Sequence, residues 1–278
     1  MKKLLFILAT GLISSVGLAQ KLPVPSPSAK LEQTVGLTEL SIEYSRPGVK
    51  GRTIFGDLVP YDAVWRLGAN ACTKFTCSTD IIVLTEVLKA GTYAMFATPI
   101  NESIWKIHFN SDTEQWGAGN YDATKDVLTV MVKAKPNVFT ETFTLAIKDI
   151  TLNSATLSIL WADTKVNIPL EINTEKIAQK NIDNAIKKGE NLDKVYYKAA
   201  NYYFKVLKDQ KKALSYIHKG LNIKKTYGLY FLRGQILNEQ GHTKEAIESA
   251  QEALALAVAE KNKDWADYIE ENIKEWKK

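Results

Sequence analysis

The sequence predicts two domains of different class, an antiparallel β-sandwich followed by an all-α region. Between residues 39 and 173 apolar residues alternate with polar ones, a pattern typical of strands that bury one face. From residue 174 onward apolar residues recur every three to four positions, which is typical of helices. A length of 278 residues, of which 45% are hydrophobic, supplies material for about two cores.

The first 19 residues predict a secretory signal peptide. Lys2 and Lys3 precede an uncharged run rich in Leu and Ile, and Gly17 and Ala19 place a small-residue cleavage site before Gln20. The alternative is a membrane anchor, but the run is shorter than the roughly 20 apolar residues that cross a bilayer. We therefore expect an exported protein, periplasmic or extracellular, with no transmembrane segment in the mature chain.

Residues 20–38 hold three Pro within five positions and predict an extended lead-in, after which residues 39–173 predict the β-domain. The alternation is clearest over 40–44, 105–109 and 155–161. Eight or nine short strands, separated by Gly, Asn and Asp turns, indicate an antiparallel sandwich of jelly-roll-like type.

Residues 174–278 predict the helical domain. We expect a first helix over 174–188 and a closing helix that carries Trp265 and Trp276. Breaks at Gly189, near 222–226 and at Gly241 divide the part between them into further helices.

A weak internal repeat runs through this domain. Shifting the chain by 33 residues aligns Ala213 with Ala246, and it places Gly234 where two helices of a hairpin could approach closely. This pattern resembles the tetratricopeptide repeat, and the alternative is a plain helical bundle with a chance match. The resemblance implies a concave face that binds a peptide, presented by Lys198, Tyr202, Lys205, Phe231, Gln235 and Asn238.

Charge does not indicate a nucleic-acid partner, because a net charge of +5 and a pI near 8.9 are too mild for one. Residues 174–225 nevertheless carry a net charge of +8. This stretch is either a solvated helix face or a surface that attracts an acidic partner. With three His in the chain and no Gly-rich phosphate loop, we expect neither a metal nor a cofactor.

Cys72 and Cys77 are five residues apart in a stretch that reads as extended. Five strand steps cover roughly 16 Å, whereas bridged Cα atoms lie about 4.4–6.8 Å apart. A disulfide would need a tight reversal between them, so we expect two separate thiols.

Catalytic motifs are scarce. The alternation places His108 on the polar face of its strand, where we expect it to face solvent rather than to serve a Ser-His-Asp relay. Paired carboxylates leave no local motif, so a hydrolase acting on a carbohydrate or peptide stays an alternative. Its candidate acids are Asp57, Asp62, Asp112, Glu114 and Asp122.

A long loop between predicted strands, residues 46–70, is rich in Gly, cations and aromatic residues. One interpretation is a packed flap, with Trp65 in the core and Arg46 or Arg66 holding carbonyl groups. The other is a recognition loop whose cations meet an anion and whose aromatic residues stack on a sugar. A second loop, 112–122, could share its rim. The candidate ligand-binding residues are Arg46, Lys50, Arg52, Tyr61, Trp65, Arg66, Asn70, Trp116 and Tyr121.

The motifs YSRPGVKGRTIFGDLVPYDAVWRLGANACTKF, LKAGTYAMFATP, WKIHFN, QWGAGNYD and DVLTVMVKA resemble the exported family known as domain of unknown function 2911, over roughly residues 24–172. The chain has Ala71-Cys72-Thr73 where the family pattern has Glu-Ala-Thr. The resemblance implies no activity. The residues that it places in the family's shared motif are Arg46, Lys50, Gly51, Arg52, Trp65, Arg66, Gly68 and Asn70.

The sequence thus favours a non-enzymatic, exported binding or scaffold protein. Its β-domain would bind an envelope component or glycan through the 46–70 loop, and its helical domain would bind a protein partner. The hydrolase is the alternative function.

Overall fold

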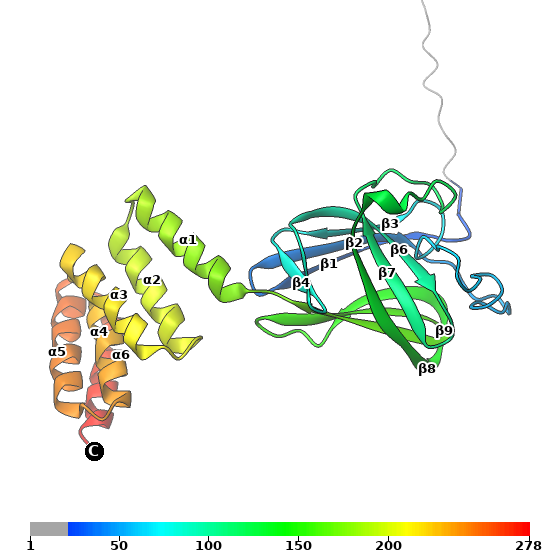
Figure 1. Ribbon diagram of the computed structural model, residues 1–278. Helices are drawn as coiled ribbons and strands as arrows, with labels where there is room; N and C mark the ends of the chain where they lie inside the picture. The colour runs from blue at the N-terminus through cyan, green and yellow to red at the C-terminus, as the bar shows by residue number, and fades with distance from the viewer. Residues whose placement is uncertain (1–21) are drawn as a thin grey trace, which may run out of the picture. The chain divides into compact units, whose positions relative to one another are not determined.

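The computed structural model describes residues 22–278, so the predicted signal peptide lies outside the described part. The chain divides into two compact units, one ending at Ile172 and the other beginning at Asn173. Figure 1 shows strands in the first unit and helices in the second. The predicted order, an antiparallel β-domain followed by a helical domain, is confirmed.

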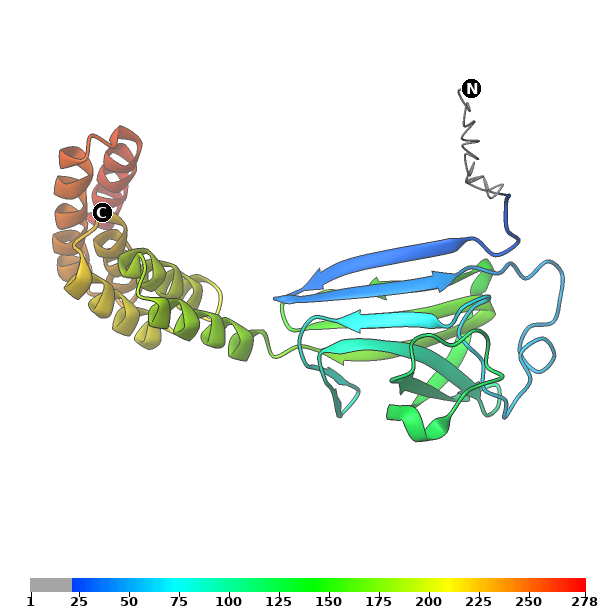
Figure 2. The same ribbon diagram turned by 90° about the horizontal axis from the view of Figure 1, so that it is seen from above.

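The β-domain is a nine-stranded antiparallel sheet with the order β1-β2-β3-β6-β7-β8-β9-β4-β5. Its strands are β1 (Ser28–Val35), β2 (Thr38–Ser45), β3 (Thr73–Cys77), β4 (Ile81–Val83), β5 (Glu86–Leu88), β6 (Gly91–Pro99), β7 (Ile104–Asn110), β8 (Asp126–Lys148) and β9 (Ser154–Glu171). A short 3₁₀ helix, η1 (Ala123–Lys125), precedes β8. In Figure 2 β1, β2 and β3 lie side by side.

The long strand β8 makes the sheet fold on itself. Up to Lys133 it pairs with β7, and from Ala134 it pairs with β9, with register shifts on either side of Thr140. β2 then faces the second half of β8, because the Tyr44 hydroxyl donates to Leu145 O (3.3 Å) and accepts from Leu145 N–H (3.2 Å). The apolar side chains of both halves therefore meet in one core.

Aromatic rings fill this core. Trp65 and Trp161 stack with centroids 5.6 Å apart, and Trp105, Phe143 and Phe55 pack around them edge to face or tilted. Because large rings bury much apolar area, this cluster ties β7, β8 and β9 to the loop that carries Trp65.

The lead-in predicted over 20–38 holds one more strand than expected. Residues 28–35 form β1, which pairs along its whole length with β2 in a continuous register. Its side chains are mostly polar and only half-buried because β1 is the outermost strand, so hydrophobic alternation did not reveal it.

The second unit consists of six helices: α1 (Thr174–Lys188), α2 (Leu192–Lys205), α3 (Gln210–Ile223), α4 (Tyr227–Glu239), α5 (Thr243–Ala259) and α6 (Lys263–Trp276). Helix α1 spans the predicted residues. It begins at an Asn173 side chain that caps Lys176 N–H and ends at Gly189 with a positive φ of 74°. Helices α2 with α3, and α4 with α5, form two packed hairpins. No helix within residues 22–278 is long and apolar enough to cross a membrane.

Gly234 lies at a close approach, as its place in the repeat predicts. A Cβ atom there would lie 3.0 Å from the carbonyl oxygen of Ala246 and 3.3 Å from the Trp276 ring. Helices α4 and α5 can therefore approach this closely only where α4 has no side chain.

Candidate functional site

The loop of residues 46–70, which we call the flap, joins β2 to β3 and is fastened at both ends. Near its start, Val49 N–H donates to Glu141 O of β8 (2.8 Å). Near its end, Trp65 and Ala97 of β6 exchange two backbone hydrogen bonds of 2.7 and 2.8 Å. Its middle is held as well, because Ile54 and Val59 are buried and Phe55 packs on Trp65 and Trp105. The flap is thus a well-anchored part of the sandwich.

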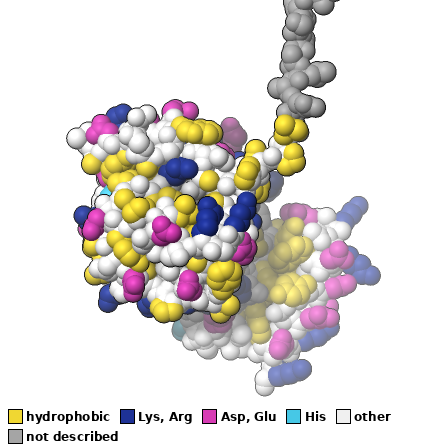
Figure 3. All heavy atoms as spheres, turned by 90° about the vertical axis from the view of Figure 1, so that its right-hand side faces the viewer, with side chains coloured by type: hydrophobic (Ala, Val, Ile, Leu, Met, Phe, Trp, Pro, Cys, Tyr) yellow, Lys and Arg dark blue, Asp and Glu magenta, His cyan; other side chains and the backbone are white. Residues whose placement is uncertain are grey.

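Together with Pro25, Ser26 and Trp161 of β9, the flap lines an open cavity of about 280 Å³, which we call the flap cavity. Its lining side chains are both apolar and cationic, and no Asp or Glu is among the described residues that line it. The residues used below are Pro47, Lys50, Arg52, Leu58, Val59, Trp65, Arg66 and Trp161. Figure 3 looks onto this end of the β-domain, where Lys and Arg side chains lie next to hydrophobic ones.

Arg46 and Arg66 play different parts, although both lie in the flap. The Arg46 guanidinium donates to Phe143 O (Nε, 3.0 Å) and to Thr144 Oγ1 (2.8 Å), so it fastens the end of β2 to β8. The half-buried Arg66 side chain has no hydrogen bond or ion pair to any residue of the described chain, and its Nε is buried. Of these two guanidinium groups, that of Arg46 is structural and that of Arg66 has no partner in the described chain.

The other cations of the flap cavity also lack a carboxylate partner within residues 22–278. The Arg52 guanidinium is oriented by the carbonyl groups of Val49 (3.0 Å) and Gly48 (2.6 Å). The exposed Lys50 uses its backbone N–H to bind the Glu141 carboxylate (2.9 Å), and its side chain forms no ion pair. The cavity therefore has an excess of positive charge.

Two residues that line the flap cavity, Arg66 and Trp161, each hold a buried donor without a partner in the described chain. Trp161 is only 2% exposed, and its Nε1–H has no acceptor in the described chain. By contrast, the Trp65 Nε1–H donates to Gly68 O (3.2 Å). Both the Trp161 Nε1 and the Arg66 Nε are fully buried, so a ligand in the flap cavity would meet other atoms of these side chains.

The same end of the β-domain has a larger cavity, of about 650 Å³. Arg52 lines both cavities, and Tyr61, Glu102, Trp105 and Asp163 line the larger one. Burial, and to a smaller extent the charge of Glu102, raises the pKa of Tyr61. A pair of carboxylates therefore lines this larger cavity.

The comparison with known families agrees with these motifs. The model of the family described as "Protein of unknown function (DUF2911)" matches residues 26–170, which is more than half of the chain. The chain belongs to this family. No curated protein and no solved structure matches it. The matched residues include every strand of the DUF2911 domain except the last residue of β9, and they include the whole flap.

Asn70, Trp116 and Tyr121 do not line the flap cavity of the DUF2911 domain. The Asn70 side chain donates to Ser26 O (3.3 Å) and Ser45 Oγ (3.2 Å), so it anchors the end of the flap. Trp116 is 72% exposed on its loop. Of the nine predicted ligand residues, four line the flap cavity (Lys50, Arg52, Trp65 and Arg66), Tyr61 lines only the larger cavity, and Arg46, Asn70, Trp116 and Tyr121 line neither.

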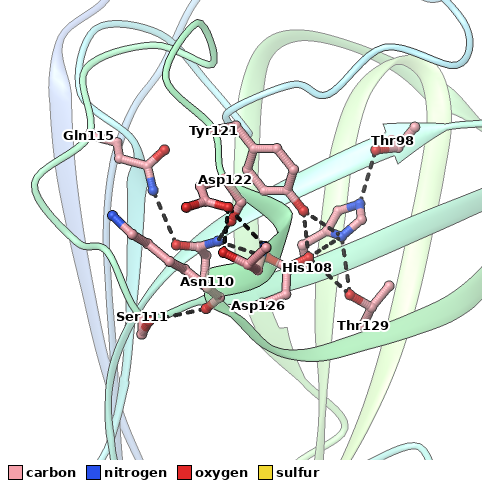
Figure 4. Close-up of polar contacts among 11 residues, drawn as sticks. Thr98, His108, Asn110, Ser111, Gln115, Tyr121, Asp122, Asp126 and Thr129 are labelled. Carbon is pink, nitrogen blue, oxygen red and sulfur yellow. Dashed lines mark hydrogen bonds and ion pairs between the residues drawn. The ribbon is translucent and has the colours of Figure 1, made fainter.

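His108 does not face solvent as expected, because it is only 7% exposed. Its Nε2 lies 2.9 Å from Thr98 Oγ1, and its Nδ1 lies 2.9 Å from Asp126 Oδ2. Figure 4 shows the ring between these groups, with Tyr121 beside it. Tyr121 belongs to the loop between β7 and β8, which covers the polar face of β7, so strand alternation alone misplaced this side chain.

The pKa of His108 is lowered, chiefly by burial, although the Asp126 carboxylate acts in the opposite direction. The neutral imidazole donates from Nδ1 to Asp126 and accepts from the Thr98 hydroxyl. This order of groups matches a hydroxyl-histidine-carboxylate relay. Thr98 is only 9% exposed, and it does not line either cavity described above, so we assign the network to holding β6, β7 and the loop together.

The five acids of the hydrolase hypothesis do not line the two cavities. Asp112 pairs with Lys125 (2.8 Å) and Glu114 with Lys74 (2.8 Å), and both pairs are at the surface. Asp122 caps η1, while Asp57 and Asp62 are exposed flap residues.

Among residues 22–278 no group of three or more His, Cys, Asp or Glu could hold a metal ion. Cys72 and Cys77 are separate, buried thiols.

In the helical unit, Phe231 is not available to a partner. It is 2% exposed, because Trp265, Tyr268 and Trp276 of α6 cover it. The sequence predicted the closing helix, but it did not predict that the aromatic residues of this helix pack on α4. The remaining candidates are exposed or half-buried, and they are Lys198, Tyr202, Lys205, Gln235 and Asn238.

Sequence reasoning missed Trp161 as a site residue. The alternation of its strand placed it correctly on the buried face, which is the usual position of a structural Trp. Trp161 lines the flap cavity although it lies 91 residues beyond Asn70, the end of the flap, and a local pattern carries no signal of that contact.

Proposed function

We propose that this chain is an exported binding and scaffold protein, whose β-domain binds an envelope component or glycan in the flap cavity. One observation supports this above all: Lys50, Arg52 and Arg66 line the cavity, and none of them forms an ion pair with a carboxylate of the described chain. Cations without a carboxylate partner attract a ligand with polar or negatively charged groups, to which guanidinium groups donate strong hydrogen bonds.

Binding is favoured over catalysis by the state of the groups in the flap cavity. Its polar side chains are three cations, two Trp indoles and the Ser26 hydroxyl, with no carboxylate or imidazole, whereas acid-base catalysis needs a base that can accept a proton. Apolar walls with a few placed polar groups are typical of small-ligand sites.

A substitution that fills the flap cavity with a large side chain tests this proposal. Ala69 lines it, so Ala69→Trp in the full chain should abolish binding to a panel of immobilised glycans. Ala63→Trp is the matched control, because Ala63 lies in the same flap and lines neither cavity. If both variants bind as the parent does, the flap cavity is not the site.

The helical unit is proposed to hold a protein partner through α2. Lys198 and Lys205 are exposed there, and the buried Tyr202 hydroxyl has no partner within the described residues. A charge-reversed full chain, Lys198→Glu with Lys205→Glu, should lose cross-links to a partner protein in the envelope, whereas Lys244→Glu on α5 should keep them. Equal cross-linking of all three chains would contradict this assignment.

Export is part of the proposal, and it is supported by the basic and apolar start of the chain. Mass spectrometry of the secreted or periplasmic protein should find a chain that begins at Gln20. Recovery from the cytosol with Met1 in place would exclude export.

A second candidate, a hydrolase, is favoured by the larger cavity, because Glu102 and Asp163 line it beside Trp105. Paired carboxylates about 5–9 Å apart hydrolyse glycosidic bonds. Under this hypothesis the full chain cleaves oligosaccharides and both Glu102→Gln and Asp163→Asn abolish cleavage, whereas Asp57→Asn does not. No turnover by the parent chain excludes it.

A further inference from the structure

Strand β1 leaves one edge of the sheet open. Its eight residues pair with β2 on one side, and no other strand within residues 22–278 pairs with its second side. Figure 2 shows β1 as the outermost strand. The unpaired N–H and C=O groups of an open edge are a template for another strand, and a very short edge strand is one common protection. At the other end of the sheet β5 has three residues, whereas β1 has eight.

The pairing with β2 fixes which backbone groups of β1 point to the open edge. Arg46 N–H donates to Pro27 O (2.9 Å), so these two residues lie opposite each other at a hydrogen-bonded position of the ladder. Such positions alternate along an antiparallel ladder, so the odd-numbered residues of β1 direct their N–H and C=O groups to β2. The even-numbered residues direct theirs to the open edge, and they are Ser28, Lys30, Glu32 and Thr34.

These four residues have exposed side chains, and the two charged ones differ in sign. Lys30 and Glu32 form an ion pair of 2.7 Å, although their side chains are 54% and 67% exposed. Lys30 also begins a row of alternating charge on the sheet, because it lies opposite Glu43 of β2, which lies opposite Lys74 of β3. An acid on a strand added at the open edge, opposite Lys30, would continue this alternation.

A second copy of β1 supplies that acid in one antiparallel register. When the pair is centred on Leu31, Lys30 of each copy lies opposite Glu32 of the other. Ser28 of each copy then lies opposite Thr34, so all the outward-pointing residues fall in hydrogen-bonded pairs and form about eight backbone hydrogen bonds. A register centred on Lys30 or on Glu32 instead places like charges opposite each other, which is destabilising.

The other face of β1 fits the same register. Leu31 is half-buried at the open edge, and it lies opposite Leu31 of the second copy in a non-hydrogen-bonded pair, where side chains come closest. Gln33 lies opposite Ala29, and both are half-buried. Because each copy uses the same residues, the contact has two-fold symmetry and ends at two copies.

We propose that the open edge of β1 pairs with β1 of a second copy of this chain, antiparallel and centred on Leu31. The dimer joins two sheets into one. No residue of β1 lines the flap cavity or the larger cavity, so the dimer does not depend on the proposed ligand or on catalysis.

Sedimentation velocity of the full chain over a concentration series measures the dimer. A single pair of strands is a small interface, so we expect a dissociation constant of about 10–100 µM. Lys30→Glu places acids opposite each other and Glu32→Lys places lysines opposite each other, so each variant alone should dimerise at least about tenfold more weakly. Lys133→Glu, an exposed position of the central strand β8, is the matched control and should dimerise as the parent does.

Mixing the two charge variants tests the register. Lys30→Glu in one chain and Glu32→Lys in the other place an acid opposite a lysine at both positions, so the mixture should dimerise as tightly as the parent. This rescue also shows that both variants keep β1 folded, because a chain that had lost the strand has no edge to pair.

A disulfide gives a second, independent measurement. Leu31→Cys places two thiols in a pair whose Cα atoms are about 4.5 Å apart, so mild oxidation should give a covalent dimer. Gln33→Cys is the matched control on the same face, because this register separates the two copies of residue 33 by about 14 Å. Cys72 and Cys77 are buried in both variants and should not cross-link.

Three results overturn the proposal. An edge that pairs with a different protein, or with nothing, leaves the parent monomeric throughout the concentration series. A parent dimer that persists in both charge variants, or that their mixture does not restore, lies at another surface or in another register. Cross-linking of Gln33→Cys as efficient as that of Leu31→Cys contradicts a pair centred on Leu31.

Discussion

Two arginines of one loop provide a sensitive test of this structure. Arg46→Met removes two charge-assisted hydrogen bonds, to Phe143 O and Thr144 Oγ1, which fasten the end of β2 to β8. Each bond contributes about 1.5 kcal/mol, the lower end of the usual range, because the side chain is half-buried. The loss in the free energy of unfolding is therefore about 3 kcal/mol. Arg66→Met removes a guanidinium with no partner in the described chain, so stability should stay within about 0.5 kcal/mol or rise.

The measurement must separate the two units, since a two-domain chain need not unfold in one step. Hydrogen-exchange mass spectrometry across a urea series measures the unfolding of β6–β8 peptides separately from that of α2–α5 peptides. We expect Arg46→Met to lower the urea midpoint of the β-domain peptides alone, with the helical peptides as internal control. If Arg66→Met destabilises the β-domain as much as Arg46→Met, Arg66 has a structural partner and the argument for a ligand at the flap cavity fails.

Three further predictions concern groups outside the flap cavity. Burial lowers the pKa of His108 in the folded protein, so below pH 6.5 the unfolded chain binds more protons than the folded one. The stability of the β-domain should therefore fall on acidification, by at most about 1.4 kcal/mol per pH unit, until the pH reaches the lower pKa of the folded state. A urea series from pH 7.5 to 5 should show this slope in the parent and not in His108→Gln; the same slope in both would assign it elsewhere. Burial raises the pKa of Cys77 to about 11 and also raises that of Cys72, so iodoacetamide should label neither thiol of the native protein, but both after unfolding. Rapid labelling of the native chain would contradict their burial. Gly234→Ala places a methyl group 3.0 Å from Ala246 O and should lower the stability of the helical unit by about 1–3 kcal/mol. Urea unfolding followed by circular dichroism at 222 nm measures this loss, and an unchanged midpoint would show that α4 and α5 separate easily.

Periodicity predicted the class of each domain because it depends on local spacing. A strand buried on one face needs apolar residues at every second position, and a helix at every third or fourth, whatever surrounds them. The α1 helix was predicted over the residues that form it, since the chain also supplies its caps at Asn173 and Gly189. Strand β1 was missed because an outermost strand buries too little to show the alternation.

Contacts between distant parts of the chain decided which side chains are buried and which have hydrogen-bond partners. Nothing in the local sequence separates Arg46 from Arg66. One is satisfied because β8 brings Phe143 O to it, almost 100 residues later, and the other is not. His108 is buried because a loop, not a strand, covers its face.

Spacing along the chain therefore determined which faces are apolar and where helices begin, and the identity of the residues in the motifs determined which family the chain resembles. It could not determine whether a donor is satisfied, because that depends on which acceptors the fold brings within about 3 Å. The Trp161 side chain has the sequence pattern of an ordinary core residue, and only the assembled sandwich leaves its N–H without an acceptor and brings the residue to the lining of the flap cavity.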